Sequence, residues 1–212
     1  MTTNGIPILH AVTNDEVVAR PDFIDLACGV MRVLGERGAL HLRASRLSGA
    51  RFQQLAEGLA AAQGLTGGLL VINDRIDIAL ASGARGAQLT SRSLTAGDAR
   101  RLGPNLRLGA SVHDVDEGIA AAAAGADWLV AGHVFSAAQP DATAQRAKWV
   151  DALVAATTVP VIVIGGVRPS HVSALRKAGV HGAAVIRGIW DAPNAEQAAS
   201  DYLSAYDEAG ST

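Results

Sequence analysis

The stretch Trp128-Leu-Val-Ala-Gly-His-Val-Phe135 decides the fold, because it passes from a buried strand to a polar turn within two residues. Asp127 to Ala131 has the pattern of a strand that is covered on both faces. Gly132 ends this strand and His133 follows at once. The same order recurs along the chain: a short apolar strand, then Gly, His, Arg, Asn or Ser, then a helix. In a barrel of alternating strands and helices such residues gather on one face, where these barrels carry their chemistry.

Strands and helices are predicted to alternate along all 212 residues. Apolar runs place the strands at 6–12, 39–43, 68–72, 86–89, 106–111, 127–131, 159–164 and 182–186. Helical spacing, with Ser48 and Asp114 as N-caps, places helices at 22–37, 48–63, 74–81, 95–102, 115–124, 169–179 and 195–206. The stretch 136–147 is predicted as a long irregular loop, the kind that often covers or binds a ligand.

This alternation predicts an α/β protein with one domain over residues 1–212, a (β/α)8 TIM barrel. The competing architecture is a doubly wound open sheet. The first strand is not followed by the Gly-rich dinucleotide loop that this fold commonly carries, and its absence favours the barrel.

Composition limits the kinds of partner. Lys plus Arg number 18 and Asp plus Glu 20, so the net charge of −2 offers no basic field for nucleic acid. The single Cys28 permits no internal disulfide and no cysteine metal cluster, and we predict a buried structural thiol. No apolar run is long enough for a membrane span and no signal-peptide pattern is present, so we expect a cytoplasmic protein without a membrane partner. No cluster of His, Asp, Glu and Cys has metal-site spacing.

Two glycine turns predict a phosphate site. Gly165 and Gly166 end the seventh predicted strand, and Arg187 and Gly188 end the eighth. Backbone N–H groups exposed by these glycines, with a helix start behind them and an Arg for charge, form the usual phosphate site of such barrels. The alternative is that the glycines only permit tight turns.

Other polar side chains at strand ends are candidates for substrate contact. His133 could take and return a proton, or could be a loop histidine bonded to a neighbouring carbonyl. Arg43 could hold a carboxylate or phosphate, or could form a structural ion pair. Asn73 could contact the ligand or only cap the next helix. The remaining candidates are Gln88, Ser111 and His113, the last two of which could instead support a helix start.

Several segments together resemble the thiamine phosphate synthase/TenI superfamily, from about Ile8 to Ile189. They are Ile72-Asn-Asp-Arg-Ile-Asp-Ile-Ala-Leu80, Leu108-Gly-Ala-Ser-Val-His113, Gly125-Ala-Asp127, Gly132-His-Val-Phe135, Val161-Ile-Val-Ile-Gly-Gly166 and Gly182-Ala-Ala-Val-Ile-Arg-Gly-Ile189. The resemblance implies one of two activities. Thiamine phosphate synthase joins a pyrimidine pyrophosphate to a thiazole phosphate, using magnesium. TenI-type proteins are thiazole tautomerases that need no metal.

The resemblance favours the TenI branch at two places. The synthase pattern Gln-x-Arg-x-Lys is His41-Leu-Arg-Ala-Ser45 here, and the acidic segment after the fourth strand is Thr90-Ser-Arg-Ser93, without a carboxylate. Two phosphates without Lys or metal would be poorly neutralised. Gln88-Leu89 and the segment from Gly132 to Phe135 match the TenI pattern.

We therefore expect an isomerase of thiamine biosynthesis that needs no metal or cofactor and acts on a small phosphorylated heterocycle. His133 would move the proton, Arg43 would hold the carboxylate, and Asn73 and Ser111 would orient the ring. The phosphate would lie on Gly165, Gly166, Arg187 and Gly188. The alternatives are a divergent thiamine phosphate synthase, a transferase, and a phosphate-ligand binder or regulator without catalysis. Family members often pair, and the apolar outer helices permit a homodimer.

Overall fold

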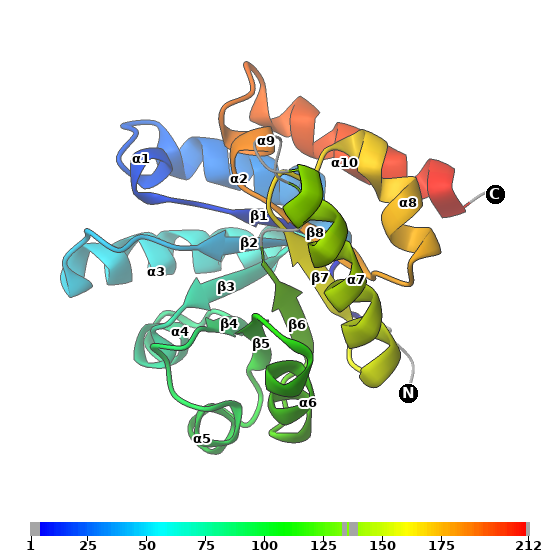
Figure 1. Cartoon of the computed structure of the whole chain (residues 1–212). Helices are drawn as coiled ribbons and strands as arrows, with labels where there is room; N and C mark the ends of the chain where they lie inside the picture. The colour runs from blue at the N-terminus through cyan, green and yellow to red at the C-terminus, as the bar shows by residue number, and fades with distance from the viewer. Residues whose placement is uncertain (1–4, 133–134, 136–139, 211–212) are drawn as a thin grey trace.

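The structure, a computed structural model, describes residues 5–132, 135 and 140–210, with the backbone alone for 140–147. Eight parallel strands close into a barrel in chain order, and helices surround it (Figure 1). The strands are β1 (Leu9–Val12), β2 (Gly38–Leu42), β3 (Leu69–Asn73), β4 (Gly86–Leu89), β5 (Arg107–Val112), β6 (Trp128–Ala131), β7 (Val161–Ile164) and β8 (Gly182–Val185). The pairing of Leu9 with Ala183 closes the ring between β1 and β8. The predicted single-domain (β/α)8 TIM barrel is confirmed.

The predicted helices are present with shifted ends, and α1 and α7 are additional to the prediction. The helical segments are α1 (Asp15–Val18), α2 (Phe23–Leu34), η1 (Gly35–Arg37), α3 (Gly49–Thr66), α4 (Ile76–Ser82), α5 (Ala96–Leu102), α6 (Val115–Ala123), α7 (Pro140–Ala156), η2 (Pro169–His171), α8 (Val172–Lys177), α9 (Arg187–Trp190) and α10 (Ala195–Gly210). Ser48 caps α3 by accepting from the N–H of Arg51, and Asp114 caps α6 by accepting from the N–H of Glu117. No helix in the described ranges has the length and apolar character needed to cross a membrane.

The predicted irregular loop over 136–147 is wrong in its second half, because α7 begins at Pro140. Pro is favourable in the first turn of a helix, where its missing N–H needs no partner. The residues that follow include Ala, Gln and Arg, which have high helix propensity. The glycine-free composition of this stretch was therefore a helix signal.

Strand alternation divides the core into two layers. Leu40 and Leu42 point outward into the layer between barrel and helices, while His41 between them points into the barrel. The barrel interior holds a smaller apolar cluster around Val71 and Trp128. Gly109 makes room for this indole, because a Cβ there would lie 2.3 Å from the Trp128 ring.

Candidate active site at the carboxyl ends of the strands

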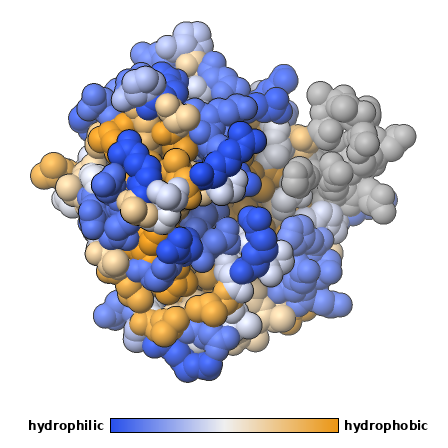
Figure 2. All heavy atoms as spheres, turned by 90° about the vertical axis from the view of Figure 1, so that its left-hand side faces the viewer, coloured by the Kyte–Doolittle hydropathy of each residue, from blue (hydrophilic) through white to orange (hydrophobic). Residues whose placement is uncertain are grey.

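A cavity of about 260 Å³ opens where β2, β3 and β4 end. Arg43, Asn73, Asp74 and Arg92 are among its lining residues. A larger cavity of about 440 Å³ includes Val161 and His181 and lies at the opposite end of the barrel, where β7 and β8 begin. Barrels of this class carry chemistry at the carboxyl ends of their strands, so we take the smaller cavity as the candidate site. Figure 2 shows the side where α1 and α3 lie, with hydrophilic side chains grouped near its centre.

Asp74 lies in a tight turn directly after β3. Its φ of 62° makes it the one left-handed non-glycine residue of the described chain, and the N–H of Arg75 closes the turn on Asn73 O at 2.8 Å. The Asp74 N–H donates to Gln88 O at 3.0 Å, which fixes the turn against β4. Such backbone strain persists only where surrounding contacts hold it, and it clusters at functional sites.

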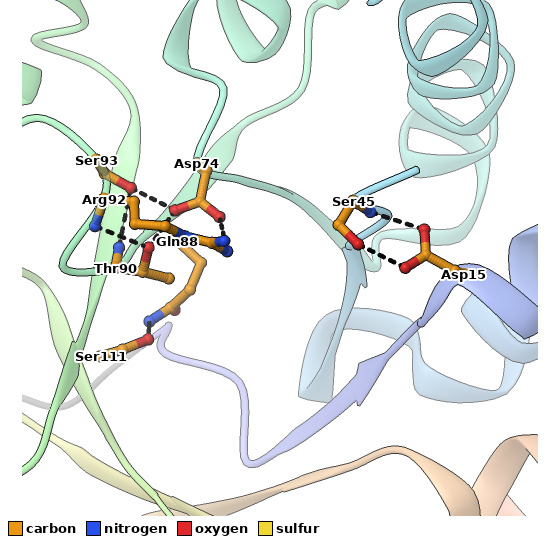
Figure 3. A network of polar contacts seen from close by, with 8 residues as sticks. All are labelled: Asp15, Ser45, Asp74, Gln88, Thr90, Arg92, Ser93 and Ser111. Carbon is orange, nitrogen blue, oxygen red and sulfur yellow. Dashed lines mark hydrogen bonds and ion pairs between the residues drawn. The ribbon is translucent and has the colours of Figure 1, made fainter. Parts of the chain in front are cut away.

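The Asp74 carboxylate is held by the loop that follows β4. Its Oδ1 accepts from the hydroxyl of Thr90 and, at 2.6 Å, from that of Ser93. Its Oδ2 lies 3.8 Å from a guanidinium nitrogen of Arg92. Figure 3 shows these three side chains converging on the carboxylate. Sequence reasoning selected neither Asp74 nor Arg92, because neither the turn nor the loop contact has a local signal.

Arg43 follows the end of β2, and its backbone is fixed by Thr13. The Thr13 hydroxyl donates to Arg43 O at 2.9 Å, and the Arg43 N–H donates back to the same oxygen atom at 2.9 Å. The Arg43 side chain is exposed, and its guanidinium has no hydrogen-bond or ion-pair partner within the described ranges. The structural ion pair that was the alternative for Arg43 is therefore absent from that part of the chain.

Ser45, at the position of the synthase lysine in the resemblance, is hydrogen-bonded to Asp15, the first residue of α1. The Ser45 hydroxyl donates to Asp15 Oδ2 at 2.6 Å, and its N–H donates to Oδ1 at 2.8 Å (Figure 3). The Arg46 N–H also donates to Oδ1, at 2.8 Å. The hydrogen bond from the Ser45 hydroxyl holds the pKa of the Asp15 carboxyl below its ordinary value. Ser45 thus organises the loop that carries Arg43, and its hydroxyl proton is already committed.

Gln88 and Ser111 form a hydrogen-bonded polar pair near the carboxyl ends of β4 and β5. Gln88 Oε1 accepts from the indole N–H of Trp128 at 3.1 Å, and its Nε2 donates to Ser111 Oγ at 3.0 Å. Because Ser111 Oγ accepts this bond, its own proton is free to donate towards a ligand. The structure thus brings Gln88 and Ser111 together with Asn73, whose Cα pairs with that of Gln88.

Two buried histidines, His10 and His41, lie beside the Trp128 ring in the barrel interior. His10 Nε2 lies 3.0 Å from Pro7 O, so this nitrogen must carry the proton that the carbonyl accepts. Burial lowers the pKa of His10 to about 4, and burial also holds the pKa of His41 well below its ordinary value, so both rings are neutral at pH 7. His10 Nδ1 is then an acceptor, and His41 Nε2 donates to it over 2.8 Å. Sequence reasoning missed this pair because His10 and His41 lie on separate strands.

The predicted phosphate residues lie across the barrel, at the ends of β7 and β8. Gly165 and Gly166 have φ of 112° and 66°. A Cβ on Gly166 would lie 2.5 Å from Phe135 O, so the turn itself requires glycine there. Arg187 begins α9 with an exposed side chain, and Gly188 follows it. Their role in phosphate binding remains a prediction.

Of the predicted residues that the structure describes, Arg43 and Asn73 line the cavity. His133 lies outside the described residues. His113 is exposed beside the start of α6, where its N–H and ring Nδ1 both contact Glu117 Oε2, at 2.8 and 3.1 Å. The alternative that His113 supports the helix start therefore describes its observed contacts.

The described residues do not fit the magnesium site that the resemblance implies for a synthase. Within the described chain there is no group of three His, Cys, Asp or Glu residues that could hold a metal ion. Asp74 is the one carboxylate that lines the cavity; its Oδ1 already accepts two hydrogen bonds, and its Oδ2 faces the Arg92 guanidinium at 3.8 Å. We derive no step through a metal ion.

The fold and the cavity define a single (β/α)8 barrel with a guanidinium-rich polar site at the carboxyl ends of its strands. Residues 9–189 match the family described as thiamine monophosphate synthase, and the chain belongs to this thiamine phosphate synthase/TenI superfamily.

Similar proteins extend this finding over the whole chain. A thiamine-phosphate synthase of Chlorobium luteolum is 33% identical over 213 residues, covering 96% of this chain and 95% of the relative. One of Pyrococcus abyssi is 36% identical over 141 residues, 66% of this chain and 68% of the relative. The solved thiamine phosphate pyrophosphorylase from Pyrococcus furiosus has a TM-score of 0.83 at 26% identity, covering 98% of both chains.

The expectation of a TenI-type tautomerase, an isomerase, is wrong. The relatives are named thiamine-phosphate synthases, and the similar solved structure is a thiamine phosphate pyrophosphorylase. The expectation rested on a missing Lys at Ser45 and a missing carboxylate in the segment 90–93. It took no account of Arg92, which brings a positive charge into the same cavity.

Proposed function

We propose that this protein is a transferase of the thiamine phosphate synthase type, which joins a pyrimidine pyrophosphate to a thiazole phosphate. The observation that carries the proposal is the similarity to the Chlorobium luteolum synthase over 96% of this chain. In this reaction the bond from the pyrimidine unit to the pyrophosphate oxygen breaks, and its electron pair leaves with pyrophosphate. The thiazole supplies the electron pair of the new bond.

The positions of the arginine side chains at the carboxyl ends of the strands support a reaction between two anionic substrates. Arg43 and Arg92 provide positive charge at the ends of β2 and β4. The glycine turns and Arg187 lie at the ends of β7 and β8. In the closed order β1 to β8, β3 and β7 are on opposite sides of the ring. One phosphorylated substrate can therefore bind at Arg43 and Arg92 and the other at the glycine turns and Arg187. Their reacting atoms would then meet between these two sites.

Asn73, Gln88 and Ser111, near the ends of β3, β4 and β5, would orient a heterocycle. Ser111 has a free hydroxyl proton, and Asn73 Oδ1 is buried with no hydrogen-bond partner in the described structure. An unpaired buried acceptor costs free energy, which a ligand N–H or O–H group would recover. Positioning two reactants in this way removes much of the entropic cost of their encounter.

The test is to incubate the purified chain with both substrates and to measure thiamine phosphate by mass spectrometry and pyrophosphate by a coupled assay. We expect the two products in equal amounts. Arg43→Ala should lower kcat/KM about 10- to 100-fold, the loss typical of a hydrogen bond to a charged group. Arg46→Ala, in the same loop but outside the cavity lining, is the matched control. Pyrophosphate binding without any thiamine phosphate would refute the transferase.

A further inference from the structure

The loop after β4 surrounds Asp74 with two hydroxyl donors and one positive charge. Thr90 and Ser93 direct their hydroxyl protons at Asp74 Oδ1, and the Arg92 guanidinium faces Oδ2 at 3.8 Å. A divalent cation with tight octahedral geometry requires oxygen lone pairs at about 2.0–2.1 Å. The lone pairs of Asp74 Oδ1 are directed at the protons of Thr90 and Ser93, and the charge that faces Oδ2 is positive.

The same groups suit an anion. The Arg92 side chain is 76% exposed, and its contact with Asp74 is a 3.8 Å ion pair, too long for a hydrogen bond. Arg43 has an unpaired guanidinium within the described chain. Arg75 is already bound to Asp77 through two hydrogen bonds, so it contributes little further charge. Two available guanidinium groups thus face one carboxylate in this cavity, which leaves it with net positive charge.

We infer that this cavity binds the pyrophosphate group through the guanidinium groups of Arg92 and Arg43, without a bridging divalent cation. Guanidinium groups match phosphate oxygens with paired N–H donors and keep their charge at every working pH. As the leaving pyrophosphate gains charge, fixed donors stabilise it without reorganisation. The identity of the anion rests on the proposed transfer reaction.

Asp74 acts as a positioning residue in this arrangement. Its backbone strain is held by the bond to Gln88 O, and its carboxylate anchors the loop through Thr90 and Ser93. The loop then carries Arg92 at the rim of the cavity, where the side chain can turn from Asp74 to the ligand.

The test is isothermal titration calorimetry of the full chain with inorganic pyrophosphate, first in EDTA and then in excess Mg²⁺. We expect binding in EDTA, with an affinity within about threefold of that in Mg²⁺. Arg92→Ala should weaken binding in EDTA about 10-fold or more. The matched control is Arg101→Ala, because Arg101 is equally exposed at 76% and also paired with an aspartate, but lies outside the cavity lining.

A double variant tests whether pyrophosphate binding can be made to depend on Mg²⁺. Thr90→Asp together with Arg92→Ala places a second carboxylate beside Asp74 and removes the competing positive charge. This variant should bind pyrophosphate only when Mg²⁺ is added, and its thermal unfolding should first show that it is folded.

Three results would overturn the inference: wild-type binding only in Mg²⁺, equal affinities for Arg92→Ala and Arg101→Ala in EDTA, or no wild-type binding in either buffer. Failure of the proposed transferase is seen separately, as pyrophosphate binding without formation of thiamine phosphate.

Discussion

Mild acid should destabilise this barrel from its interior, because His10 and His41 are buried as neutral rings. Protonation of either ring places a charge among Trp128, Asn73 and the other imidazole. Protonation of His10 also sets two donors against each other, because His41 Nε2 already donates to His10 Nδ1 in the neutral pair. The unfolded chain accepts the proton at the ordinary histidine pKa, so acid favours unfolding.

The magnitude follows from the pKa of His10, which falls from 6.5 to about 4. A lowered histidine pKa leaves stability unchanged above about pH 6.5, and stability falls as the pH drops from there towards about 4. The full loss is about 3 kcal/mol, of which about 2 kcal/mol appears between about pH 7.5 and about pH 5. His41 adds a loss of the same sign. Domains of this kind are stable by only about 5–15 kcal/mol, so the change is easily measured.

The assay is urea unfolding followed by circular dichroism at the two pH values. The double variant His10→Gln/His41→Gln keeps donors and acceptors but removes the titration, so its loss of stability between the two pH values should be smaller by about 2 kcal/mol or more. His113→Gln is the matched control, because His113 is 64% exposed and far less constrained. If wild type and the double variant lose stability equally, the buried pair is not the source of acid sensitivity and the reasoning is refuted.

Two further substitutions test contacts that support the site: the turn at Gly166 and the hydrogen bond between Gln88 and Trp128. Gly166→Ala introduces a Cβ at 2.5 Å from Phe135 O at a φ of 66°, so we expect a loss of about 1–3 kcal/mol in thermal unfolding. Gly64→Ala, in a helix with open space around it, should instead be neutral or stabilising, and equal effects of the two would contradict the clash. Gln88→Leu leaves the Trp128 indole N–H without its acceptor and should cost about 1–3 kcal/mol in urea unfolding. An unchanged midpoint would show that this hydrogen bond contributes no net stability.

The barrel could be predicted from the sequence because its signals are local. Apolar runs ending at a polar residue, such as Leu40-His41-Leu42-Arg43, determine both the strand and the side of the barrel that each residue faces. Caps at Ser48 and Asp114 were visible for the same reason. The helix over 140–147 was missed because the stretch was assigned as an irregular loop, although Pro140 and the Ala, Gln and Arg residues after it favour a helix.

The contacts that build the site are not local and could not be predicted. Asp74 meets Ser93 across 19 residues, Ser45 meets Asp15 across 30, and His10 meets His41 across 31. Neither propensity nor periodicity specifies such pairings, which arise only when the register of the closed barrel brings strand ends together. Candidate residues could therefore be named from the sequence, while their partners could not.

This difference explains why the predicted activity was wrong although the superfamily was right. The argument against a transferase treated charge neutralisation as a property of two motif positions, Ser45 and the segment 90–93. In the folded protein it is a property of the cavity. Ser45 is committed to Asp15, while Arg92, whose charge was not counted, stands 3.8 Å from the cavity's one lining carboxylate. An enzyme that loses a lysine and a metal ligand can keep its reaction if guanidinium groups supply the same charge at the same place. Missing motif residues therefore discriminate between activities only after all the charged groups that line the cavity have been counted.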